Sequence, residues 1–152
     1  MKKYILIFAA VHVFMLTAKS QDYLTRNGSV SIYSHTPLED ISAQNNETLS
    51  VLNSSTGDIE FKVAVKGFHF AKTAMEEHFN NPDYMDSEKF PKAGFKGKVT
   101  NLSAVNFSKD GSYKVTVQGD LTMKGITKPV SAQGTITVSN GTVTAVSTFN
   151  VN

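Results

Sequence analysis

Residues 112–139 read SYKVTVQGDLTMKGITKPVSAQGTITVS, and this stretch decides the fold. In its first half, Tyr113, Val115, Val117, Leu121 and Met123 alternate with polar residues such as threonine and lysine. The second half alternates in the same way, with apolar residues at Val130, Ala132, Ile136 and Val138. A period of two gives a strand one dry face and one wet face, as antiparallel sheets require. The stretch therefore predicts two long antiparallel strands.

The same alternation continues on both sides of this stretch. Between residues 57 and 68, apolar Ile59, Phe61 and Val63 alternate with Glu60 and Lys62. Asp110-Gly111 and Asn140-Gly141 tolerate the positive φ of tight hairpin turns. We expect an antiparallel meander of strands at 93–105, 112–124, 128–139 and 142–151, and shorter strands at 29–35, 38–44 and 48–53.

One segment has a helical pattern instead. Phe70, Ala74, Met75 and Phe79 gather on one side of a helix, which Pro82 should end, leaving a fixed loop as far as Pro91. Long strands with one short helix predict an all-β fold, either a barrel or a sandwich. Glycines at positions 97, 119 and 134 lie on apolar faces, where they leave room and let a strand bend. We therefore favour an extended antiparallel barrel.

Residues 1–20 have the anatomy of a secretory signal peptide. Lys2 and Lys3 precede an apolar run over residues 4–17, and Ala18 and Ser20 are the small residues of a cleavage site. We predict cleavage between Ser20 and Gln21, a domain over residues 21–152, and a periplasmic or secreted protein. The apolar run is shorter than the about 20 residues that a spanning helix needs, although an uncleaved anchor is the alternative. We expect no stable membrane insertion.

The charge and cysteine content exclude several classes of partner. Cleavage removes three lysines and no acidic residue, which leaves 12 basic residues against 13 acidic ones. A net charge near −1 predicts no surface for nucleic acid. The chain has no cysteine, so disulfides, thiolate metal sites and a lipid-modified cysteine are excluded.

Two stretches in the expected order resemble those of a known family. Residues 119–130, GDLTMKGITKPV, resemble the Gly-Asp-Leu-Thr hairpin motif of YceI-like proteins, and residues 78–91, HFNNPDYMDSEKFP, are similar to that family's helix-to-loop segment. The resemblance covers residues 57–151. It implies a lipocalin-like antiparallel barrel in a periplasmic or secreted protein that encloses a polyisoprenoid or similar long lipid.

The resemblance is weaker at both ends of the domain. Residues 22–56 match only loosely, and residues 33–41 look like a shorter variant common in Bacteroidetes-type members. Family members continue past the strand that closes at Val151. We therefore expect the final barrel strands to be missing, which leaves either a fragment or a barrel with an exposed edge.

No arrangement of residues predicts catalysis. The histidines at positions 35, 69 and 78 lack metal-ligand spacing, and we predict neither a metal nor another cofactor. Glu76, Glu77 and His78 are adjacent on a helix and so do not face one another. We expect His78 to fasten the helix to the following loop, and Asp86 and Glu88 to turn or cap that loop. The chain is predicted not to be an enzyme.

The apolar faces carry the functional hypothesis of a carrier for a long isoprenoid or quinone-like chain. Tyr33, Tyr113 or Thr122 could bind a polar head. Alternation does not distinguish a hollow barrel from a filled one, so a packed structural or interaction module is the alternative, and a homodimer stays open. The predicted ligand-binding residues are Phe61, Val63, Val65, Phe68, Phe70, Met75, Phe79, Phe95, Val117, Leu121, Met123 and Ile136.

Overall fold

The alternating stretches fold as strands, and the helical pattern folds as a helix, in the computed structural model of the chain. The structure describes residues 21–35 and 37–151, so the predicted signal peptide lies outside the described residues. The strands are β1 (Asp22–His35), β2 (Asp40–Asn53), β3 (Asp58–Ala64), β4 (His69–Phe70), β5 (Lys92–Val99), β6 (Gly111–Met123), β7 (Ile126–Ser139) and β8 (Thr142–Ser147). The helix is α1 (Thr73–Asn80), and the 3-10 segments are η1 (Val65–Gly67) and η2 (Leu102–Ala104).

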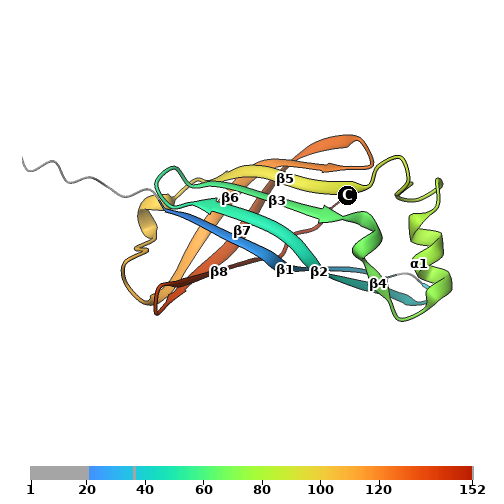
Figure 1. Ribbon diagram of the computed structural model, residues 1–152, viewed down its shortest axis with the longest axis horizontal. Coiled ribbons are helices and arrows are strands. Elements are labelled where there is room, and N and C mark those ends of the chain that lie inside the picture. Colours follow the sequence, from blue (N-terminus) through green and yellow to red (C-terminus); the bar gives the residue numbers. More distant parts are fainter. Residues whose placement is uncertain (1–20, 36, 152) are drawn as a thin grey trace, which may run out of the picture.

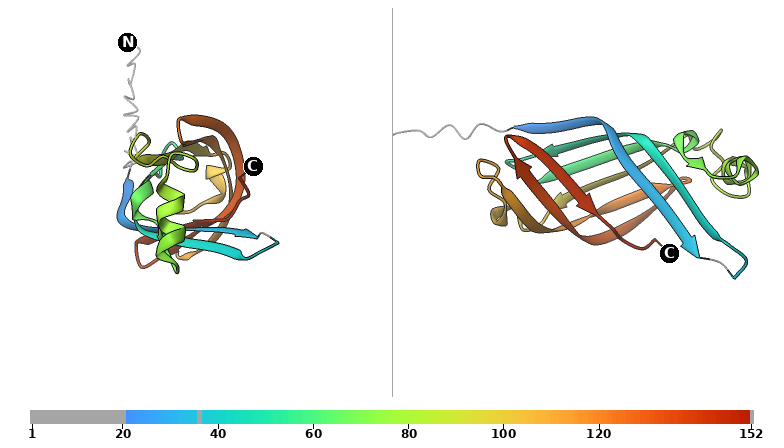
Figure 2. Two further views of the ribbon diagram at one scale, coloured as in Figure 1. Left: turned by 90° about the vertical axis from the view of Figure 1, so that its right-hand side faces the viewer. Right: turned by 90° about the horizontal axis from the view of Figure 1, so that it is seen from below.

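The strands form one curled sheet in the order β1-β2-β3-β5-β6-β7-β8, with the short β4 paired to β2. All of these pairs are antiparallel. The sheet wraps into a nearly closed, elongated barrel with α1 at one end (Figures 1 and 2). The prediction of an all-β, lipocalin-like antiparallel barrel with one short helix is confirmed.

Strand register determines which side chains face the interior. Phe95 on β5 pairs with Leu121 on β6, and Val99 pairs with Val117, which in turn pairs with Ala132 on β7. Because directly paired residues project to the same side of a sheet, these apolar positions share the inner face. Lys96 and Lys98, which alternate with these apolar positions on β5, project outward and are exposed.

Several of the predicted strand boundaries are wrong. The short strand expected at residues 29–35 begins at Asp22 and has 14 residues. The strand expected over residues 93–105 ends at Val99, because the Asn101 side chain takes over its pairing to β6. The Asn101 amide donates to the Lys114 carbonyl at 3.1 Å, and its oxygen accepts from the Thr116 amide at 2.8 Å. The segments expected at 38–44 and 48–53 form one continuous strand, β2, whose register against β1 shifts near Gly28. The last strand ends at Ser147.

Two tight turns join the last three strands. Asn140 and Gly141 both have positive φ, 50° and 79°, which confirms the predicted Asn-Gly hairpin turn. Lys124 and Gly125, at 48° and 71°, turn β6 into β7 in the same way. Asp110-Gly111 does not form a hairpin turn, because Gly111 already belongs to β6. Instead, the Asp110 carboxylate accepts a hydrogen bond from the Asn140 amide at 3.0 Å.

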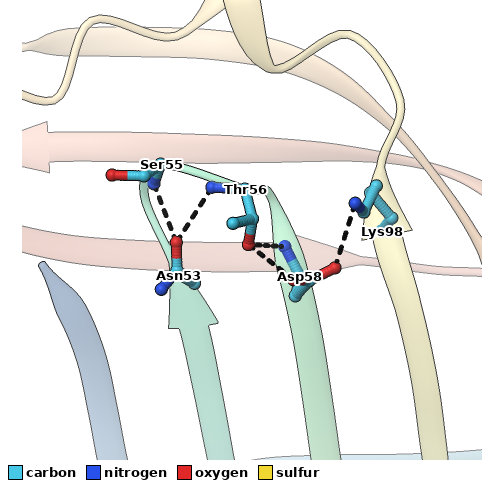
Figure 3. Close-up of polar contacts among 5 residues, drawn as sticks. All are labelled: Asn53, Ser55, Thr56, Asp58 and Lys98. Carbon is cyan, nitrogen blue, oxygen red and sulfur yellow. Dashed lines mark hydrogen bonds and ion pairs between the residues drawn. The ribbon is translucent and has the colours of Figure 1, made fainter. Parts of the chain in front are cut away.

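Side-chain hydrogen bonds hold the turn between β2 and β3 (Figure 3). Asn53 Oδ1 accepts from the amides of Ser55 and Thr56, both at 2.9 Å. The Thr56 hydroxyl donates to Asp58 at 2.6 Å, and Lys98 lies 3.2 Å from the same carboxylate. The hydrogen bond from Thr56, followed by that from Lys98, lowers the pKa of Asp58 below its ordinary value. The turn is therefore fixed by local polar contacts and tied to β5.

Replacing Asn53 with alanine should destabilise this turn. The substitution removes the acceptor of two backbone amides, so we expect Asn53→Ala to lower the free energy of unfolding by about 1–2 kcal/mol. Urea denaturation followed by circular dichroism measures the change. Ser55→Ala is the matched control, because the turn uses the amide of Ser55. Equal stability of the two variants would contradict this account of the turn.

Candidate functional site

Apolar side chains occupy both ends of the barrel. The helix-end cluster is defined by its buried members and by the half-buried residues packed on them: Ala43, Val63, Val65, Phe68 and Ala93, with Val30, Ile32, Phe70, Phe79, Met85 and Met123. Phe79 on α1 contacts Phe68 and Phe70, with ring centroids 5.8 and 5.0 Å apart. Through Phe79, α1 packs against this end of the barrel and covers part of it (Figure 2).

The opposite end is covered by the segment around η2. Phe107 stacks on Tyr23 at 5.6 Å. The far-end cluster consists of buried Leu52, Val99, Val115, Ile136 and Val138, with Tyr23, Ile59, Leu102, Val105, Phe107, Tyr113, Val117 and Val143 packed against them. Both barrel ends are therefore lined by the chain's own apolar residues.

Between the two clusters lies a third group of inward residues, which we call the central band: Phe61, Phe95, Leu121, Val130 and Ala132. None of them belongs to either cluster. Phe61 and Phe95 stack at 5.4 Å across β3 and β5. Phe95 and Leu121 are buried, whereas Phe61, Val130 and Ala132 face inward and yet are only half-buried. Three inward apolar residues of the central band therefore keep part of their surface accessible to solvent.

The structure divides the predicted ligand-binding residues among these regions instead of gathering them into one site. The helix-end cluster contains Val63, Val65, Phe68, Phe70, Phe79 and Met123. The far-end cluster contains Val117 and Ile136. Phe61, Phe95 and Leu121 lie in the central band, while Met75 is half-buried on α1 outside both clusters. Ligand contact by these residues stays a prediction.

Two facing glycines bring β5 and β6 unusually close together. Gly97 pairs with Gly119, and a Cβ atom on Gly119 would lie 2.3 Å from the Lys96 carbonyl oxygen. A Cβ atom on Gly97 would lie 2.6 Å from the Phe95 ring. The glycines thus permit a close approach of the backbones, as a bending strand requires. The expectation that Gly97 leaves room for a ligand is wrong, because the Phe95 ring takes that room.

Charged side chains on this part of the wall project away from the interior. Lys62 lies 2.9 Å from Glu60 on β3, and Lys96 on β5 lies 3.7 Å from the same carboxylate. Lys62, followed by Lys96, lowers the pKa of Glu60 below its ordinary value. The inward positions beside them hold Phe61, Phe95 and Gly97. Among the inward positions of the described strands, only Lys128, which pairs with Leu121, is charged, and it is exposed. Such an inner face fits an apolar ligand, since no buried charge has to be desolvated.

Two open depressions border the central band. One, of about 490 Å³, lies over β6 and β7 around Gly119 and Val130. The other, of about 290 Å³, is bordered by Phe61 and Phe95. Asp120 lines both of them, so they adjoin on β6. Their linings consist mostly of outward-facing residues, so both are open depressions on the outer surface of the wall and not enclosed chambers.

Of the three residues considered for a ligand head, two project outward and the third, Tyr113, has its hydroxyl engaged by the backbone. Tyr33 projects outward and is exposed, and the Thr122 hydroxyl lies 2.8 Å from that of Thr127 on the outer face. The Tyr113 hydroxyl donates to the Lys109 carbonyl at 2.8 Å. Thr48 on β2 is a better candidate. Its side chain is buried on the inner face, and among the described residues its hydroxyl has no hydrogen-bond partner.

The histidines make separate local contacts. His35 contacts Asp40 at 2.6 Å, and His69 lies 3.6 Å from Glu76. The His78 ring packs on Tyr84 at 4.5 Å, which joins the helix to the following loop as expected. In that loop Asp86 has a φ of 48°, and its carbonyl accepts from the Phe90 amide at 2.8 Å. Over residues 21–35 and 37–151, no group of three potential metal ligands comes together.

Two parts of the interior were not predicted from the sequence. Val30 and Ile32 alternate within a predicted strand, and this signal could have identified them as inward residues of the helix-end cluster. Leu102, Val105 and Phe107 follow the end of β5 without a regular period, so no pattern indicated that they cover the far end. The helices in the described part of the chain are too short or too polar to cross a membrane.

Comparison with solved structures supports the fold. A polyisoprenoid binding domain from Saccharophagus degradans, implicated in plant cell wall breakdown, superposes with a TM-score of 0.67 at 11% sequence identity. The match covers 84% of this chain and 74% of that one.

Sequence comparisons identify the family. Two UPF0312 proteins are similar to this chain. Protein plu2095 of Photorhabdus laumondii is 28% identical over 83 residues, and its Pseudomonas fluorescens counterpart is 31% identical over 77 residues. The matches cover 55% and 51% of this chain but only 39% and 38% of the relatives' own lengths. The YceI-like domain profile matches residues 15–152. The chain therefore belongs to the YceI-like domain family.

Proposed function

We propose that the protein is an exported lipid-binding protein, periplasmic or secreted, that holds a polyisoprenoid or another long apolar chain along its central band. Support comes from family membership and from a structural neighbour described as a polyisoprenoid binding domain. The observation that carries the proposal is the partial exposure of Phe61, Val130 and Ala132, which face inward. Apolar residues that face inward and stay accessible to solvent offer an apolar ligand a surface to bury.

Hydrophobic burial provides the affinity in this proposal. Burying one methylene group of a lipid contributes about 0.8 kcal/mol, so about ten such groups would gain about 8 kcal/mol before the costs of association. The half-buried inner residues and the stacked pair of Phe61 and Phe95 would form the contact surface. No ion pair is needed to hold such a ligand.

The alternative is an interaction module with a solid core. It is favoured by β8, an edge strand of threonine, valine, alanine and serine without a charge or proline to discourage pairing. A module of this kind would bind a partner strand and have no use for lipid. The two functions therefore differ in their response to added lipid.

A long isoprenoid should stabilise the protein. Geranylgeraniol at about one hundred times its dissociation constant should add about 2.7 kcal/mol to the free energy of unfolding, which corresponds to a rise in Tm of about 5–10 °C. Differential scanning calorimetry measures the shift. Lipid extraction from protein purified from its native host, followed by mass spectrometry, would identify the natural ligand. An unchanged Tm together with no extractable lipid would favour the interaction module.

A phenylalanine at position 132 should compete with the lipid for space. Ala132 faces inward and is half-buried, so Ala132→Phe should place a ring in the interior and weaken geranylgeraniol binding about tenfold, equivalent to about 1.4 kcal/mol. Ser131→Phe, one residue earlier on the outer face, is the matched control and should bind normally. Titration of intrinsic fluorescence gives both affinities. Equal affinities would place the ligand outside the central band.

The Thr48 hydroxyl, which is covered in the lipid-free protein, should hydrogen-bond the polar head of a ligand that displaces the side chains over it. Thr48→Val removes a buried hydroxyl without a partner, so the lipid-free protein should become more stable by about 1 kcal/mol. Its affinity for geranylgeraniol should fall about three- to tenfold, whereas its affinity for squalene, which has no hydroxyl, should not change. Parallel losses for both lipids would show that the hydroxyl has a structural role only.

A further inference from the structure

The strands β2 and β3 separate at the helix end of the barrel. In the described chain, β2 pairs with β3 over residues 49–52, and closer to the helix end it is paired on this side only by the short β4, at residues 43–44. β3 meanwhile stays paired with β5 as far as Ala64. The chain bridges the space with η1 and β4, and the Asn45 side chain ties the bridge to the wall by donating to the Ala64 carbonyl at 3.0 Å. The segment between β4 and β5 therefore covers what the strands do not.

Residues 73–90, which we call the cap, make up this segment. They comprise α1 and the loop after it, and they lie beyond the ends of β3 and β5 (Figures 1 and 2). Hydrogen bonds join the helix to the loop. The Met85 amide donates to the Phe79 carbonyl at 3.0 Å, and the amide of buried Ser87 donates to the Asn80 carbonyl at 3.2 Å. The cap is therefore one body.

Two half-buried side chains join the cap to the helix-end cluster. Phe79 and Met85 pack against it, and the Phe79 ring lies between those of Phe68 and Phe70 at the distances given above. The Glu76 carboxylate also accepts a hydrogen bond from the Phe70 amide at 3.1 Å. None of the eight residues of α1 is buried. A helix of this length is not stable by itself, so it depends on these contacts.

The other polar contacts between the cap and the barrel are exposed. Lys124, in the turn between β6 and β7, donates to the Pro82 carbonyl at 2.8 Å, and Lys66 forms an ion pair with Glu88. Exposed ion pairs contribute little to stability. Opening the cap therefore breaks a small number of contacts, and it leaves the hydrogen-bond ladders of the wall intact.

We propose that the cap is a gate, which opens as one body and admits an apolar chain to the inner face through the helix end. The inference rests on the proposed lipid function and adds a moving part to it. Residues 71–72 connect the cap to β4, and Pro91 connects it to β5, so these short links are the hinges. Behind the cap, Val63 and Ala93 of the helix-end cluster pair with each other directly beside the stacked rings of the central band. An entering chain thus meets an apolar path.

A buried thiol beneath the cap measures its opening without any lipid. The chain has no cysteine, so Ala43→Cys places a single thiol in the helix-end cluster, and Val138→Cys is the matched control in the far-end cluster. Ala43→Cys should react with a disulfide reagent such as DTNB at least about tenfold faster than Val138→Cys. Low concentrations of urea should hardly change its rate, because opening the cap exposes little surface. Rates that are equal and rise together with urea would show that only global unfolding exposes both positions.

A cross-link between the cap and the β6–β7 turn tests whether the ligand uses the gate. Asp83 follows Pro82, so thiols in the double variant Asp83→Cys, Lys124→Cys lie within reach of a short bis-maleimide, since the Lys124 side chain already spans this distance. The same double variant with both thiols blocked by N-ethylmaleimide is the matched control. Stopped-flow fluorescence with the anthraniloyl ester of geranylgeraniol measures association and dissociation. The cross-link should slow both rates at least about tenfold with little change in Kd, and the blocked variant should match the unmodified protein.

The outcomes separate the gate from the proposed function. Equal probe kinetics in the cross-linked and blocked proteins, with normal affinity, would overturn the gate and leave the lipid function intact. Exposure of the thiol at position 43 by global unfolding alone would also overturn the gate, without any bearing on lipid binding. Absence of probe binding by the unmodified protein would overturn both.

Discussion

The register of the antiparallel ladder is the constraint on which the rest of the structure depends. Pairing Phe95 with Leu121 and Val99 with Val117 places apolar residues on the inner face and leaves Lys96, Lys98 and Asp120 on the outer face. A slip by one residue would turn lysines into the barrel and phenylalanines into water. The turns at Lys124-Gly125 and Asn140-Gly141 fix this register over the longest strands. An interior without a buried charge follows directly from it, since Lys128, the inward partner of Leu121, is exposed.

The apolar clusters at the two ends of the barrel follow from the same register. They leave the central band between them as the part of the inner face that stays accessible to solvent.

Much of the fold was predictable from local pattern, and the internal shape of the barrel was not. Alternation identified the inner faces of β3, β6 and β7, and the spacing of Ala74, Met75 and Phe79 identified α1. The prediction that Phe70 belongs to the helix is wrong, because Phe70 pairs with Ala43 as part of β4. The position of the Phe95 ring over Gly97 depends on a close approach of β5 and β6, which no single strand encodes.

The polar residues buried on β2 were also not predictable. Asn45 is fully buried, donates to the Ala64 carbonyl at 3.0 Å and accepts from the Glu47 amide at 2.8 Å. A residue type typical of turns thus lies inside the continuous strand β2. Thr48 became a candidate only once its burial was known.

The central claim is that an apolar chain lies against the inner face between the two clusters. Photo-crosslinking with a geranylgeraniol analogue that carries a diazirine on its chain, followed by peptide mass spectrometry, tests this claim most directly. The account predicts adducts on the inward residues Phe61, Phe95 and Val130, which unlabelled geranylgeraniol suppresses. Adducts confined to the exposed outer residues Leu24, Leu49 and Val51, or adducts that excess lipid does not suppress, would contradict it.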